Sequence, residues 1–253
     1  MKLFARTPSR DPSRIRSGLR HLCKELAKLL GDELESVIVY GSFVRTGDLE
    51  SEHDVANLML VVRSANYQTL DKIAGPITHA EKEIPLSTMI LTSEDLHSSC
   101  DVFPIKFHDM KMHHRVLMGE EVFSNLQISD AHLRLRCEQR LKNLMLRMRA
   151  EYLRHLASNQ LLFDVLMEAN RKFLYDMHAC LVVKTGIAPE ENVDLATAYG
   201  DEFGLNADVV NEILNLRKEG DIPNLGDLKS KFGCLMQLVH DSALAVDRLE
   251  VKA

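Results

Sequence analysis

The stretches VIVYGS at residues 37–42 and DVANL at residues 54–58 decide the fold of the first half of this chain. The first stretch begins with apolar, mostly β-branched residues and stops at Gly41, so it predicts a buried strand that turns at a Gly-Ser step. The apolar run at residues 58–62 predicts a second buried strand. A strand that ends in Gly41 and Ser42 places backbone N–H groups and a hydroxyl in the turn, where they can contact phosphate oxygens.

The flanking segments extend this α/β pattern. The expected helices cover residues 12 to about 31 and 67–77, and the expected strands cover residues 37–40, 58–62, 86–91 and 102–107. Asp11 and Pro12 supply the cap and the first residue of the first helix. Thr92 and Asp95 have the spacing of a capping box, which predicts a short helix after the third strand. Pro104 predicts that the fourth strand begins there or lies at a sheet edge.

Strand-like runs disappear after about residue 125, and apolar residues then recur at helical spacing. The expected helices cover residues 133–152, 161–183, 193–199, 209–216 and 225–249. The sequence therefore predicts an α+β chain with two domains: an α/β domain at residues 1–125 and an all-helical bundle at residues 126–253.

Composition excludes several classes of protein. A chain of 253 residues with 45% hydrophobic residues can bury a large core, which excludes a disordered chain. No apolar run is long enough to span a membrane, and five scattered cysteines are typical of reduced thiols in the cytoplasm. The net charge of -6 disfavours a general nucleic-acid binder without excluding nucleic acid. Basic residues gather at 134–154, where a solvated helix face is favoured over a phosphate-binding surface.

The strand, the Gly41–Ser42 step, the eleven-residue spacer and Asp54 together resemble the DNA polymerase β-like nucleotidyltransferase superfamily. The resemblance is to its small, aminoglycoside-type members, which carry a helical C-terminal domain. It implies an α/β domain with a small mixed sheet, a triphosphate held by Gly41 and Ser42, and Arg45 as a phosphate contact. In that superfamily two acids at i and i+2 on one strand and a third from a neighbouring strand bind Mg²⁺ ions.

The chain departs from this pattern at the metal ligands. Asp54 matches the first acid, but Ala56 stands at i+2, and a slip of one residue gives Asn57, an amide. The segment FPIKFHD at residues 103–109 resembles the strand that carries the third acid, and its register places Lys106 there. Asp109 has the opposite side-chain parity, so it would need a bulge to reach the site. We expect the Lys106 ammonium to lie where a metal would, paired with Asp54.

Two functions follow from the resemblance, and the sequence leaves enzymatic activity open. The first is a pseudoenzyme with a degenerate metal site that binds a nucleotide or a protein partner and acts as a regulator, with no cofactor. The alternative is an active transferase that moves a nucleoside monophosphate from an NTP to a hydroxyl acceptor, with Asp54 and Asp109 as catalytic acids and Asp54 and Asn57 as ligands of Mg²⁺. A homodimer through the helical half is a third possibility. The sequence does not identify the acceptor or the preferred nucleotide.

Overall fold

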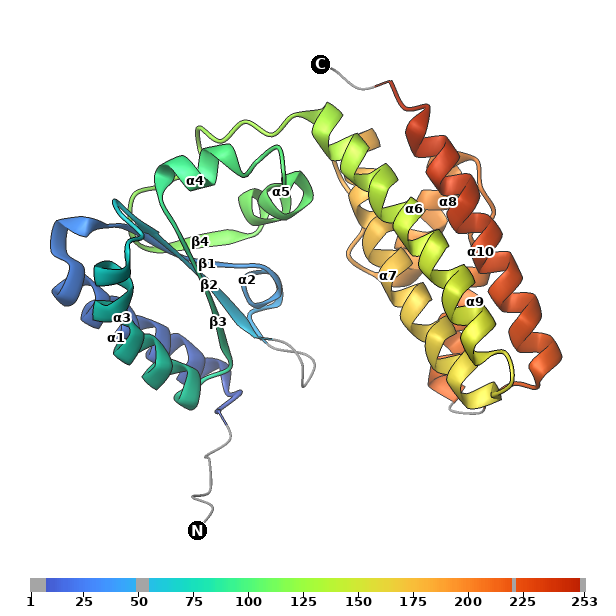
Figure 1. The fold of residues 1–253 in the computed structure, drawn as a ribbon, viewed down its shortest axis with the longest axis horizontal. Helices are drawn as coiled ribbons and strands as arrows, with labels where there is room; N and C mark the ends of the chain where they lie inside the picture. Colours follow the sequence, from blue (N-terminus) through green and yellow to red (C-terminus); the bar gives the residue numbers. More distant parts are fainter. Residues whose placement is uncertain (1–7, 49–54, 220–221, 251–253) are drawn as a thin grey trace, which may run out of the picture. The chain divides into compact units, whose positions relative to one another are not determined.

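A computed structural model describes residues 8–48, 55–219 and 222–250. The chain forms two compact units, Met1–Ile128 and Ser129–Ala253. The first unit holds the four strands and the second is all helical (Figure 1). In the described residues, no helix is long and apolar enough to cross a membrane. All five cysteines are free, and four of them are buried.

A four-stranded mixed sheet with the order β3-β2-β1-β4 forms the centre of the first unit. The strands are β1 (Leu34–Tyr40), β2 (Ala56–Val62), β3 (Leu86–Leu91) and β4 (His114–Gly119). β1 pairs antiparallel with β2 and with β4, whereas β2 and β3 are parallel. The parallel pair is joined by the crossover helix α3 (Tyr67–Glu83), as parallel strands require.

Helices cover both faces of this sheet (Figure 1). Residues of α1 (Pro12–Leu30) and α3 pack on one face against Val37, Val39 and the even-numbered residues of β2. The helices α4 (Ser93–Ser98) and α5 (Pro104–Met112) pack on the other face against Ile38, Tyr40, Met59 and Val61. Because side chains alternate along a strand, this packing fixes which residues of each strand lie on the α1 and α3 face and which on the α4 and α5 face.

The local helix signals are confirmed. The Asp11 side chain accepts a hydrogen bond from Ser13 N at 2.8 Å, and Pro12 is the first residue of α1. Thr92 and Asp95 form the capping box at the start of α4. Such caps satisfy backbone N–H groups that have no partner inside the helix.

The predicted strand at residues 102–107 is wrong, because this segment contains the start of α5. Pro104 occupies the first turn of that helix, where its missing N–H has no helical partner to lose. Phe107 and Met110, three residues apart, are both buried against the sheet. The fourth strand is β4, which follows the helix and pairs with β1.

The second unit consists of five helices over its described residues. They are α6 (Asp130–His155), α7 (Asn159–Thr185), α8 (Asn192–Phe203), α9 (Asp208–Glu219) and α10 (Leu225–Asp247). Several basic residues of α6 are paired with acids: Arg134 and Lys142 with Glu138, and Arg154 with Glu151. These pairs favour a solvated helix face over a phosphate-binding surface.

A buried ion pair joins α6 and α7. Arg140 Nε lies 2.6 Å from Asp176 Oδ1, and the Asp176 side chain is 4% exposed. Burial raises the pKa of Asp176 to about 6, although the charges of Arg140 and Lys172 act in the opposite direction. Desolvation of the carboxylate therefore outweighs its attraction to the guanidinium.

This imbalance predicts an unusual pH dependence of stability. An acid whose pKa is raised by folding destabilises the folded state progressively as pH rises from about 4 to about 6. Asp176→Asn should therefore unfold at higher urea concentration than wild type at pH 8, by up to about 3 kcal/mol, with a gain about half as large at pH 5. The exposed Asp201→Asn on α8 is the control and should show no such change. Lower stability of Asp176→Asn at pH 8 would mean that the pair with Arg140 stabilises the fold.

Candidate functional site

The Gly41–Ser42 turn lies at the carboxyl end of β1. Gly41 has φ 82° and ψ -150°, a conformation essentially restricted to glycine. A Cβ at this position would lie 3.3 Å from Nδ2 of Asn57. Gly41 N donates to the backbone oxygen of His113 at 2.9 Å. Ser42 then begins the short helix α2 (Ser42–Thr46), so the turn connects β1 with the start of β2 and the end of α5.

Three polar side chains form a row across the sheet beside this turn. Asn57 pairs with Tyr40 of β1 and, on its other side, with Ser87 of β3. Each of them lies two residues from a side chain that packs on the α4 and α5 face, namely Ile38, Met59 and Met89, so all three share that face of the sheet. We call Tyr40, Asn57 and Ser87 the polar row. It presents two hydroxyls and an amide.

Helix α5 adds charged side chains over the same face. Lys106 Nζ lies 3.5 Å from Sδ of Met89. Asp109 Oδ1 lies 3.9 Å from Nε2 of His113, the residue that caps the helix. Burial, and secondly the negative charge of Asp109, raise the pKa of the Tyr40 hydroxyl. Asp109 is thus near the end of β1, whereas Lys106 contacts β3.

The structure brings together several of the residues singled out from the sequence. Gly41, Ser42, Asn57, Lys106 and Asp109 all belong to the end of β1, the start of β2 or the overlying helix α5. Asp109 approaches this face from a helix, so the expected need for a bulge in a strand does not arise.

Two further residues predicted from the sequence are not part of this group. Arg45 is exposed on α2. Asp54 lies outside the described residues, so the expected Lys106–Asp54 pair also lies outside them.

Sequence reasoning did not link Tyr40, Ser87 or His113 to this site. The alternation of β3 could have shown that Ser87 shares a face with Met89 and Leu91. Its place beside Asn57 depends on the strand pairing, which the sequence does not state. His113 would have been linked to the site only by recognising Pro104 as the first residue of a helix.

The described residues do not fit a magnesium centre. Mg²⁺ prefers carboxylate oxygens, and the polar row supplies none. Asp109 is the described carboxylate that acts on Tyr40, and the Lys106 ammonium on this face would repel a cation. In the described part of the chain, no cluster of three or more His, Cys, Asp or Glu side chains could hold a metal ion.

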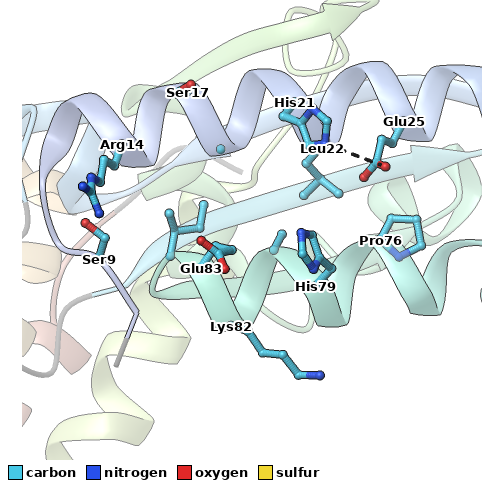
Figure 2. A pocket seen from close by; sticks show the side chains of 13 residues that line it. Ser9, Arg14, Ser17, His21, Leu22, Glu25, Pro76, His79, Lys82 and Glu83 are labelled. Carbon is cyan, nitrogen blue, oxygen red and sulfur yellow. Dashed lines mark ion pairs between the residues drawn. The ribbon is translucent and has the colours of Figure 1, made fainter. Parts of the chain in front are cut away.

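A separate pocket of about 480 Å³ lies between α1 and α3, on the opposite face of the sheet (Figure 2). Arg14, Lys82, Glu25 and Glu83 line it, and Nε2 of His21 lies 3.8 Å from Oε1 of Glu25. Its cations and acids balance, and it contains none of the site residues predicted from the sequence. The polar row is therefore the stronger candidate.

The Gly41 conformation can be tested by substitution. Gly41→Ala should lower the free energy of unfolding by about 1–3 kcal/mol, because the side chain would be strained and would press on Asn57. Gly75→Ala, on α3, meets nothing within 4 Å and should be neutral or stabilise by about 0.5–1 kcal/mol. Urea unfolding of both variants gives the comparison. Equal stability of the two variants would show that the turn tolerates a side chain.

No protein-family model and no curated protein sequence matches the chain. Its structure is similar to that of spectinomycin adenyltransferase from Enterococcus faecialis, solved with ATP and spectinomycin. The TM-score is 0.55 at 12% sequence identity, over 89% of this chain and 99% of that chain. A nucleotidyltransferase-like protein from Exiguobacterium sibiricum aligns with a TM-score of 0.33 and 14% identity, over 94% of this chain and 77% of that chain. The first of these similarities shows that the chain has the nucleotidyltransferase fold.

Proposed function

We propose that this protein binds a nucleoside triphosphate at the Gly41–Ser42 turn and acts as a regulatory pseudoenzyme with a depleted metal site. The observation that carries the proposal is the polar row, in which two hydroxyls and an amide lie beside a glycine-dependent turn. The similarity to an adenyltransferase solved with ATP supports a nucleotide as the ligand. Fold alone does not assign an activity, so the proposal rests on the chemistry of the site.

The turn has the groups needed to hold phosphate. Backbone N–H groups of the turn after Gly41 and the Ser42 hydroxyl can donate to phosphate oxygens. Gly41 lets the backbone approach closely, since it carries no Cβ. In this proposal Arg45, on the same short helix, adds a cation at the edge of the site. The protein acts in the cytoplasm and passes its nucleotide state to a protein partner or a second copy through the helical unit.

Nucleotide binding is tested by titration calorimetry with ATP and GTP. Ser42→Ala should weaken binding about 3- to 10-fold, the loss expected for one hydrogen bond. Ser17→Ala is the matched control, because Ser17 lines the pocket between α1 and α3. If Ser17→Ala weakens binding and Ser42→Ala does not, the nucleotide binds in that pocket instead of at the turn.

The second candidate is an active Mg²⁺-dependent nucleotidyltransferase. One observation favours it: Asp109 lies close enough to Tyr40 at the end of β1 to raise its pKa. In this candidate Asp54, Asn57 and Asp109 would position one Mg²⁺. Pyrophosphate release from ATP in the presence of Mg²⁺ and hydroxyl acceptors distinguishes the two. We expect none. Release that is abolished by Asp109→Asn would establish the transferase.

A further inference from the structure

Lys106 is a cation without an acidic partner among the described residues. It is exposed on α5 between the buried residues Ile105 and Phe107, and Phe107 packs against the sheet. Its ammonium contacts the thioether sulfur of Met89 at 3.5 Å. A thioether is a weak acceptor, so this contact holds the ammonium only loosely.

The position of Met89 places this cation near the polar row. Met89 and Ser87 are two residues apart on β3 and lie on the same face, which separates them by about 7 Å along the strand. A lysine side chain has four rotatable carbons and can span such a distance. The ammonium can therefore move from Met89 to a ligand lying over the polar row without any change in the backbone.

From this arrangement we propose that the site binds the polyphosphate of a nucleotide in its metal-free form, with the Lys106 ammonium in place of a divalent ion. The proposal rests on the proposed function, since it needs the nucleotide to lie at the Gly41–Ser42 turn. A free triphosphate carries a large negative charge, and a lysine acts on phosphate as a point charge. The polar row supplies hydroxyl and amide donors to oxygens that a metal would otherwise hold.

Metal-free binding differs from ordinary Mg²⁺-nucleotide binding in its response to added Mg²⁺. Mg²⁺ in solution neutralises two charges of ATP and occupies the oxygens that Lys106 would contact. Adding Mg²⁺ should therefore weaken binding. Added salt should weaken it as well, because a partly exposed ammonium is screened.

The experiment measures the Kd of ATP by calorimetry in EDTA and again in excess Mg²⁺. Wild type should bind more tightly in EDTA, by 3-fold or more. Lys106→Met keeps the length of the apolar stem and removes the charge. It should lose 10-fold or more in EDTA and lose the difference between the two conditions. Lys72→Met, on α3 at the other face of the sheet, is the control and should behave as wild type.

Three results would overturn the inference, and they are distinguishable. Tighter binding in Mg²⁺ than in EDTA would show that the nucleotide brings its metal, while the proposed function would stand. Unchanged ATP binding by Lys106→Met would show that the lysine does not contact the nucleotide, and the proposed function would again stand. An absence of ATP and GTP binding under both conditions would overturn the proposed function itself.

Discussion

The candidate site depends on the close approach of Gly41 to its neighbours. Its backbone N–H is bonded to the His113 oxygen, and its missing side chain leaves room for the Asn57 amide. One residue thus joins the end of β1, the start of β2 and the end of α5. The φ and ψ of Gly41 lie in a region that other residues avoid, so the geometry of the turn beside the polar row requires glycine.

Charge decides what this geometry can bind. The polar row is uncharged at neutral pH, and α5 places both a carboxylate and an ammonium over the same face. Such a surface does not favour a bare divalent cation, which needs several anionic ligands. It suits an anion that accepts hydrogen bonds and meets the Lys106 ammonium. We therefore propose that the turn and Lys106 recognise the nucleotide, whereas the transferase alternative depends on Asp109.

Much of the fold follows from local sequence. Asp11 and Thr92 cap their helices, and apolar runs form β1 and β2. Residues that are close in the sequence determine each of these elements. The segment after Phe103 shows where this fails. Proline is compatible with both an edge strand and the first turn of a helix, so Pro104 did not distinguish them. Burial of Phe107 and Met110 against the sheet decided for the helix.

The site was less predictable than the fold, because it combines strand pairing with helix placement. Because side chains alternate along β2, Asn57 lies on the face of the sheet that α1 and α3 do not cover, and the sequence can show this. The sequence cannot show that Ser87 lies beside Asn57, since the two strands are joined by a long helical crossover. Asp109 was expected on a strand of the wrong parity, yet a helix brings it to the end of β1.

The most direct test is crystallography of the protein grown with ATP and MnCl₂, using the anomalous signal of manganese. We expect a triphosphate at the Gly41–Ser42 turn, contacted by the Lys106 ammonium, with no manganese peak over the polar row. A manganese peak bound by Asn57 and Asp109 would contradict it and would establish the metal-dependent transferase instead.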